Sequence, residues 1–154
     1  MPIIKKIIDK LIKKNISISV AESCTGGLIA NTITKYSGVS KIFSYGIIAY
    51  SNKAKSKYLS VSKTNLSKFG AVSKEVAEDM INGLYENERT KICISTTGIA
   101  GPNGGTKLKP VGLVYIGIKI NNKNYIFKKI YKGNRLDIQR KTRDFIFRKI
   151  NELI

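Results

Sequence analysis

The amino-acid sequence predicts an α/β protein, a three-layer α/β/α sandwich built around a mixed β-sheet. Segments with helical periodicity alternate with short β-branched segments over most of the chain, which is typical of parallel strands covered by helices. Two strand-like segments then follow each other across a short Asn-rich turn, as in an antiparallel hairpin. The 154 residues contain no internal repeat or linker, so we expect residues 1–154 to form a single domain; the order of its strands does not follow from the sequence.

The first part of the chain contains a helix, a strand and a second helix in turn. Isoleucine and leucine recur every three or four residues among lysines over 3–14, which predicts an amphipathic helix. Residues 16–21 alternate in polarity and predict a strand. Two glycines then open a helix over 28–33, so this region reads as a strand, a tight turn and a helix.

The remaining elements are predicted from the same kinds of pattern. Residues 41–50 are rich in isoleucine and aromatic side chains and predict a strand, after which Asn52 begins a capped helix. The glycine-rich segment 97–105 is expected to be a loop. The other expected elements are a helix over 74–85, a strand over 91–96, a hairpin of 111–120 with 124–131, and a closing helix over 136–153.

The composition is that of a globular protein, with 42% hydrophobic and 25% charged residues. Cys24 and Cys93 lack the spacing of metal ligands, so we expect a reduced, cytoplasmic setting and neither a metal nor a cofactor. No apolar run approaches the length that crosses a membrane. The net charge of +18 is scattered along the chain, which favours a solvated lysine surface over nucleic-acid binding.

A candidate nucleophile lies in the sequence AESCTGG at 21–27, at the change from strand to helix. Ser23 has the placement of a nucleophilic hydroxyl, and the glycines let a substrate approach backbone amides. A serine before a helix is also a common N-cap, a role that Thr25 could share. Cys24 is a rival nucleophile, but the chain has no histidine to activate its thiol.

The absence of histidine also narrows the choice of base. Because schemes that use Ser-His-Asp are excluded, the remaining common activator of a serine is a lysine whose pKa is lowered by burial. Lys55 and Lys53 both have suitable positions, and sequence spacing does not choose between them. Tyr50, at the end of a predicted strand, is a candidate to hydrogen-bond this pair, although a tyrosine there also serves for packing.

Three segments with candidate residues follow predicted strands: Ser23, residues 50–55 and residues 97–105. In α/β folds ligands bind at the carboxyl ends of strands, so we expect these segments to meet in one cleft. The amides of the third segment could hold a phosphate, but its glycines match neither the P-loop nor the dinucleotide-binding spacing.

Five motifs occur in order along nearly the whole chain: AESCTGG at 21–27, YSNKAK at 50–55, GAVS at 70–73, GIAGPNGG at 98–105 and KPVG at 109–112. Together they resemble the CinA carboxy-terminal domain family. The resemblance implies the three-layer fold and a nicotinamide-nucleotide amidohydrolase, which converts nicotinamide mononucleotide (NMN) to nicotinate mononucleotide and ammonia through a Ser/Lys dyad.

The resemblance also implies roles for individual residues. Ser23 would be the nucleophile, Lys55 the base and Tyr50 the assisting tyrosine. A pyridine nucleotide would be the substrate, no cofactor would be needed, and the protein would self-associate. The expected substrate-binding residues are Thr25, Gly26 and Gly27, whose amides would stabilise the oxyanion, together with Thr97, Gly98, Gly101 and Arg140.

The helix over 136–153 departs from the family pattern. The family usually has an arginine and a glutamine where this chain has Gln139 and Lys141, and we expect Arg140 to replace that arginine. These departures motivate an alternative, a catalytically weak protein that only binds a nucleotide or a partner. Nucleic-acid binding is a third hypothesis, suggested by the charge of +18 but supported by no groove-entering motif.

Overall fold

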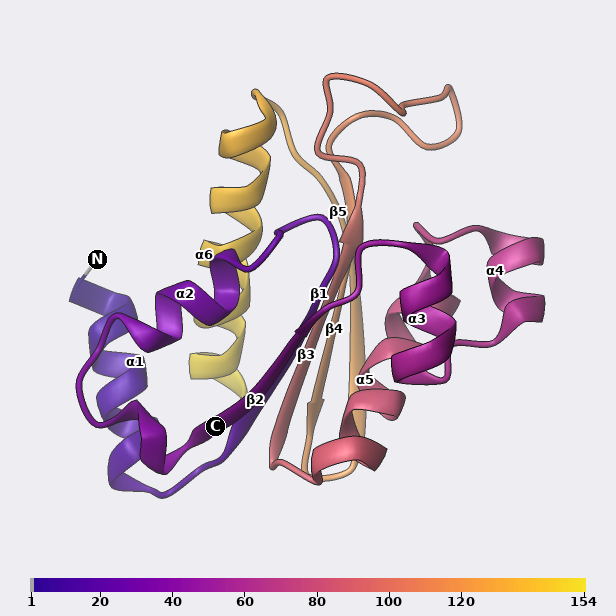
Figure 1. Ribbon diagram of the computed structural model, residues 1–154. Helices are drawn as coiled ribbons and strands as arrows, with labels where there is room; N and C mark the ends of the chain where they lie inside the picture. The colour runs from indigo at the N-terminus through magenta and orange to yellow at the C-terminus, as the bar shows by residue number, and fades with distance from the viewer. Residues whose placement is uncertain (1) are drawn as a thin grey trace.

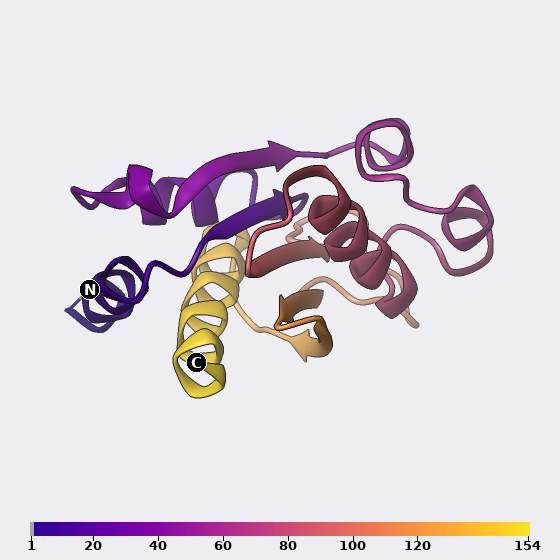
Figure 2. The same ribbon diagram turned by 90° about the horizontal axis from the view of Figure 1, so that it is seen from below.

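The computed structural model describes residues 2–154 and shows a central sheet between two layers of helices (Figure 1). Helices α1 (Pro2–Lys13), α2 (Leu28–Thr34) and α6 (Arg135–Leu153) cover one face, and α3 (Asn52–Leu59), α4 (Lys63–Phe69) and α5 (Lys74–Glu88) lie on the other. Seen from below, the indigo α1 and yellow α6 stay apart from the magenta and rose helices α3 to α5 (Figure 2). This arrangement confirms the expected three-layer α/β/α sandwich.

The sheet contains five strands in the order β2-β1-β3-β4-β5. Their bounds are β1 (Ile18–Glu22), β2 (Phe43–Ile48), β3 (Ile92–Gly98), β4 (Leu113–Ile120) and β5 (Lys123–Ile130). Strand β1 pairs in parallel with both β2 and β3, whereas β3 with β4 and β4 with β5 are antiparallel. The carboxyl ends of β1, β2 and β3 therefore lie along one edge of the sheet.

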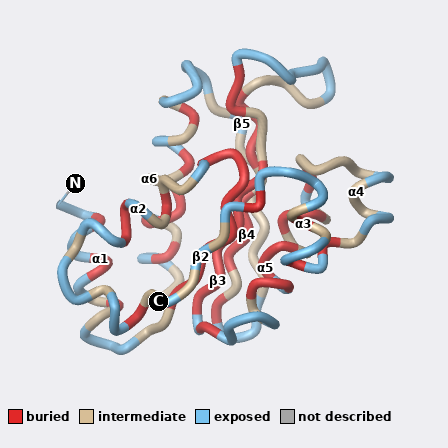
Figure 3. The backbone as a smooth tube through the Cα atoms, viewed as in Figure 1, coloured by how far each residue is buried: buried red, intermediate tan, exposed pale blue. Residues whose placement is uncertain are grey.

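The hydrophobic side chains form one cluster on each face of the sheet. Alternate residues of β1 point to opposite clusters: Val20 packs with α1, α2 and α6, and Ala21 packs with α3 and α5. The central strands are buried along most of their length, while the outward faces of the helices are exposed (Figure 3). Burial on both faces explains why β1 and β3 carry few charged side chains.

The expected helices and strands are present, with ends that shift by a few residues. The expected turn after β4 consists of Asn121 and Asn122, with φ of 53° and 64°, a left-handed geometry that asparagine tolerates well. Helix α4 was not expected, because seven residues capped by Ser62 carry no clear apolar period.

Two expectations about the ends of strands were wrong. Thr97 and Gly98 belong to β3, not to a loop, because they pair with Tyr115 and Val114 of β4. At the start of the expected strand over 41–50, the backbone still forms a 3₁₀ turn (Val39–Lys41) before β2 begins. In the described residues, every helix is too short or too polar to cross a membrane.

Candidate active site

A cleft of about 250 Å³ opens at the carboxyl ends of β1, β2 and β3. The structure brings the three expected segments together around it, because those parallel strands end at the same edge of the sheet. A fourth wall comes from the chain before α5 and from the start of α6. The lining residues include Ser23, Cys24, Tyr50, Asn52, Lys55, Ala71, Val72, Thr97, Gly98, Gly101 and Arg135.

Ser23 lies one residue beyond β1, in the turn that leads to α2. Its amide donates to the carbonyl oxygen of Thr96 at 3.0 Å and approaches Thr96 Oγ1 at 3.2 Å. These contacts continue the pairing of β1 with β3 past the last strand residue. They hold the serine in the cleft, with 8% of its surface exposed.

Lys55 reaches Ser23 from α3. The N-cap Ser51 accepts a hydrogen bond from the amide of Ala54, and this cap fixes the first turn of the helix. From the fourth helical position, Lys55 Nζ donates to Ser23 Oγ at 2.9 Å and to the carbonyl oxygen of Tyr50 at 3.3 Å. The lysine is only 2% exposed, and this burial lowers the pKa of its ammonium group.

The two rivals weighed from the sequence occupy different environments. Lys53 is exposed and lines a separate groove on α3 instead of the cleft. Cys24 lines the cleft, but burial raises the pKa of its thiol to about 12, which keeps the sulfur protonated at neutral pH. The geometry therefore favours Lys55 over Lys53 and Ser23 over Cys24.

Tyr50 contacts the pair through its backbone, not through its phenol as expected. Its side chain is 58% exposed at the mouth of the cleft, where the hydroxyl accepts a hydrogen bond from Arg135 Nη2 at 2.7 Å. Arg135 Nη1 also donates to the carbonyl oxygen of Gly101 at 2.7 Å. The guanidinium thus ties the β2–α3 connection to the glycine-rich loop across the cleft.

The amides of Gly26 and Gly27 do not point to an empty oxyanion site. Gly26 donates to the carbonyl oxygen of Ser23 at 3.1 Å, and Gly27 donates to Glu22 Oε1 at 3.2 Å. The hydroxyl of Thr25 also donates to Glu22 Oε1, at 2.5 Å. Neither the two glycines nor Thr25 lines the cleft, so the sequence expectation for these three residues is corrected.

The carboxylate of Glu22 occupies the hydrogen-bonding groups of this turn. This carboxylate is 1% exposed and lies against the first turn of α2, where it also accepts from the amides of Ile29 and Ala30 at 2.9 and 3.0 Å. A buried carboxylate in this position is satisfied by helix amides and by the positive end of the helix dipole. Sequence reasoning missed this role, although an acidic residue that ends an apolar strand is itself a signal.

Thr97, Gly98 and Gly101 all line the cleft, as expected. Thr97 Oγ1 donates to the carbonyl oxygen of Ala71 at 2.7 Å, which joins β3 to the wall before α5. Gly101 has φ of 81°, and a Cβ there would lie 2.4 Å from Val111 Cγ1. Glycine is therefore required for this backbone to pass the KPVG segment.

The arginine of α6 that lines the cleft is Arg135, not the expected Arg140. Arg140 is exposed and does not line the cleft, whereas Arg135 does. Gln139 Nε2 donates to the carbonyl oxygen of Cys24 at 3.0 Å and so stabilises the turn that follows Ser23. Lys141 donates to the carbonyl oxygen of Lys132. The capping box of Asn134 and Asp137 marks the helix start and was the signal that could have identified Arg135.

Comparisons with known proteins identify the family and agree with the fold. The family model "CinA C-terminal domain" matches residues 1–154. A CinA-like protein of Kosmotoga olearia is 49% identical over 152 residues, which are 96% of this chain and 37% of that protein. A CinA-like protein of Fusobacterium nucleatum is 54% identical over 129 residues, 84% of this chain and 31% of that protein. The chain thus spans about a third of the length of these relatives.

Solved structures show the same fold. The competence/damage inducible protein CihA of Agrobacterium tumefaciens has a TM-score of 0.94 and 35% identity, covering 99% of this chain and 93% of that one. A CinA superfamily protein of Escherichia coli has a TM-score of 0.93 and 29% identity, covering 99% of this chain and 88% of that one. With the family model matching its whole length, the chain belongs to the CinA C-terminal domain family.

Proposed function

We propose that this protein is a nicotinamide-nucleotide amidohydrolase that hydrolyses the carboxamide of NMN. One observation carries the proposal: a buried lysine amine lies 2.9 Å from a serine hydroxyl in a cleft at the carboxyl edge of the sheet. The lowered pKa of Lys55 supports it, because a neutral amine can accept the serine proton. The substrate itself is inferred from the motifs shared with the family.

In the first half of the reaction, Ser23 attacks the amide. With Lys55 neutral, the contact runs in the other direction, and the Ser23 hydroxyl donates to the lone pair of Nζ. Oγ bonds to the carboxamide carbon as its proton passes to Nζ, which gives a tetrahedral oxyanion. Within residues 2–154, the amide of Cys24, which lines the cleft, donates to no other residue, so we assign the oxyanion to this amide.

In the second half, the tetrahedral intermediate collapses. The carbon–nitrogen bond breaks, and the proton held by Lys55 passes to the leaving nitrogen, so ammonia departs and an ester on Ser23 remains. Lys55, again neutral, takes a proton from water, and the resulting hydroxide attacks the ester carbon. Return of that proton to Ser23 Oγ releases nicotinate mononucleotide and restores the dyad.

The walls of the cleft would orient the substrate. Tyr50, Thr97 and Gly101 surround the dyad, and the contacts of Arg135 hold two of these walls in register. We further propose a cytoplasmic location, where the free thiols of Cys24 and Cys93 stay reduced. Self-association is also part of the proposal, on the basis of the family resemblance alone.

The test is ammonia release from NMN by the purified protein and its variants. We expect Ser23→Ala and Lys55→Met to lower kcat at least about 1,000-fold, because each removes a member of the dyad. Met keeps the aliphatic volume of Lys55, and circular dichroism checks that both variants fold. Lys6→Ala, an exposed change on α1, is the matched control and should behave as the parent protein.

Two results would contradict this assignment. Ser23→Ala with most of the parent's ammonia release would remove Ser23 as the nucleophile. A loss of kcat in Lys53→Ala as large as that in Lys55→Met would mean that the wrong lysine was chosen as the base.

A further inference from the structure

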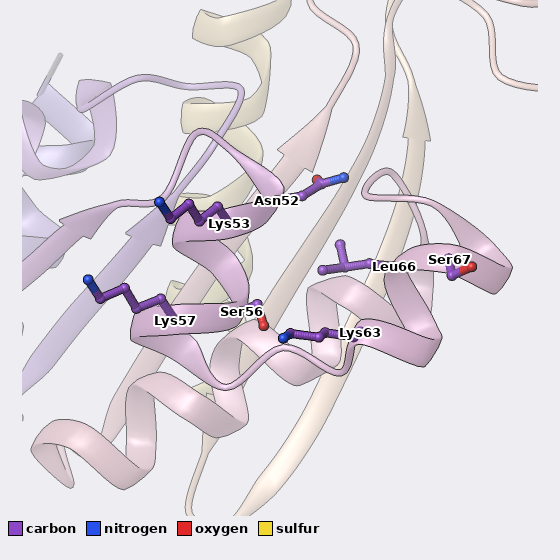
Figure 4. A pocket seen from close by; sticks show the side chains of 7 residues that line it. All are labelled: Asn52, Lys53, Ser56, Lys57, Lys63, Leu66 and Ser67. Carbon is purple, nitrogen blue, oxygen red and sulfur yellow. The ribbon is translucent and has the colours of Figure 1, made fainter.

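A second and larger hollow, of about 790 Å³, lies between α3 and α4 (Figure 4). We call it the lysine groove. Its lining residues are Asn52, Lys53, Ser56, Lys57, Lys63, Leu66 and Ser67. Lys53 and Lys57 extend from the same side of α3, while Lys63 reaches from α4 toward Ser56 (Figure 4).

The lysine groove has the chemistry of an anion site. Three of its seven lining residues are lysines, Asn52 and two serines add neutral hydrogen-bonding groups, and no carboxylate lines it. In the described part of the chain, the salt bridges all involve other cations, so Lys53, Lys57 and Lys63 have no acidic partner. A small polyanion would therefore meet unneutralised ammonium groups there.

The lysine groove adjoins the candidate active site through the start of α3. Asn52 lines both the groove and the cleft that holds Ser23. Helical periodicity places Lys53 and Lys57, four residues apart, on one side of α3 and directs Lys55 to the other. The same two turns of helix thus supply the proposed base to the cleft and two cations to the groove.

Apart from the proposed base, the described residues of the cleft offer a phosphate one cation, Arg135. The cleft has a volume of about 250 Å³, and its charged side chains are Lys55 and Arg135. Lys55 serves as a neutral base in the proposed mechanism, and Arg135 uses Nη1 and Nη2 to hold the neutral oxygens of Gly101 and Tyr50 across the cleft, although its charge has no acidic partner among residues 2–154. A nucleotide with its carboxamide at Ser23 extends its phosphate away from the dyad, and the adjoining groove, with three lysines, presents more positive charge to it than the cleft does.

We propose that the lysine groove binds the phosphate group of the nucleotide substrate, with Asn52 at the junction between the two parts of the site. This inference rests on the proposed function, since it assigns a subsite to that substrate. It makes Lys53 and Lys63 determinants of specificity for phosphorylated over unphosphorylated pyridine nucleosides. Both act as point charges, so the preference should weaken as salt rises.

The kinetic test compares NMN with nicotinamide riboside, which lacks the phosphate. In Lys53→Ala/Lys63→Ala we expect KM for NMN to rise about tenfold, the loss typical of a charge-assisted hydrogen bond, with kcat within about twofold of the parent. The ratio of kcat/KM for NMN to that for the riboside should fall by the same factor. Lys6→Ala/Lys13→Ala, which removes two exposed charges from α1, is the matched control.

Two kinetic results would overturn the proposal: an unchanged KM for NMN, or an equal loss for both substrates. An Arg135→Ala variant that alone loses the preference for NMN would also overturn it, because the phosphate would then lie at α6.

A binding measurement separates this proposal from the proposed function. If the parent protein releases no ammonia from NMN, the amidohydrolase assignment fails, and the groove is still tested with inorganic phosphate followed by amide resonances in NMR. We expect phosphate to shift the resonances of residues 52–57 and 63–67, and to do so much less in Lys53→Ala/Lys63→Ala. Shifts confined to other parts of the chain, or no shifts, would overturn the phosphate site.

Discussion

At the scale of single residues, the site depends on two buried ionisable groups, Lys55 and Glu22, which differ in how their hydrogen-bond partners compensate for burial. Lys55 has hydrogen bonds to two oxygens but no acidic partner, so burial favours its neutral form. Glu22 instead accepts a hydroxyl and three amides. One group is thereby suited to accept a proton, and the other fixes the turn that carries Ser23.

Replacement of Glu22 should show how much this turn depends on the carboxylate. In Glu22→Ala the hydroxyl of Thr25 and the amides of Gly27, Ile29 and Ala30 lose their acceptor, so we expect a loss of about 3 kcal/mol in the free energy of unfolding. Glu22→Gln keeps one acceptor oxygen and should lose less. Urea unfolding measures both, with the exposed Glu152→Ala as control.

The opposite ranking of the two Glu22 variants would contradict the prediction. So would a Glu22→Ala protein as stable as the parent, because the carboxylate would then contribute nothing to the turn.

At the scale of elements, α3 is held in place by its contact with α5. Gly83 of α5 lies against the carboxyl end of α3, where an added Cβ would be 1.8 Å from the carbonyl oxygen of Leu59. Leu59 is buried in the same cluster as Met80 and Leu84. Because Lys55 lies one helical turn before Leu59, this close approach of the helices also helps to fix the position of the Lys55 amine relative to Ser23.

Gly83→Ala should therefore destabilise the protein although alanine is the better helix former. We expect a loss of about 2 to 3 kcal/mol, since backbone atoms and not a flexible side chain block the methyl group. Thermal and urea unfolding measure the change, and Glu86→Ala, at an exposed position of the same helix, is the control. A gain in stability, as helix propensity alone predicts, would show that α3 and α5 separate at no cost.

Elements with a clear hydrophobic or β-branched pattern could be predicted from the sequence, whereas elements that depend on contacts between distant residues could not. The amphipathic pattern of α1 and the aromatic and β-branched run of β2 depend on local residues. Helix α4 and the last residues of β3 depend on partners distant in sequence: Asp79 accepts from the amide of Ser62 before α4, and β4 pairs with Thr97. Such contacts leave no periodic signal.

The same distinction holds for the candidate site. Strand ends located Ser23, and the missing histidine pointed to a lysine, because both arguments are local or compositional. Sequence spacing left Lys53 and Lys55 open, and only the family resemblance implied Lys55, because the choice depends on the direction of α3 relative to the sheet. The hydrogen bond from Arg135 to Gly101 could not be predicted, because it depends on the position of α6 beside a loop more than thirty residues earlier in the chain.

At the scale of the whole molecule, the stability of the fold is linked to the protonation of Lys55. Burial lowers its pKa in the folded state below the unfolded value of 10.5, so between these two values the unfolded chain binds more protons. Stability from this group therefore rises with pH through that window. Below the lowered pKa both states are protonated, and the folded protein carries the full cost of a buried charge.

This linkage predicts a pH-dependent difference between the parent and Lys55→Met. The variant should be more stable below the window, and its advantage should shrink as pH rises toward 10.5, by at most about 1.4 kcal/mol per pH unit. Urea unfolding of both proteins at a series of pH values gives the difference, in which the other lysines cancel. A difference that stays constant with pH would contradict the linkage.

The most direct test of the account is the titration of the Lys55 amine itself, because the mechanism requires that amine to be neutral beside Ser23. The resonance of its side-chain carbon next to Nζ can be followed by NMR from pH 5 to 11, with Lys55→Met to assign it. The account predicts that Lys55 titrates below the ordinary lysine value of 10.5. Titration of Lys55 at or above 10.5 would contradict it, since Ser23 would then face an ammonium ion and have no base.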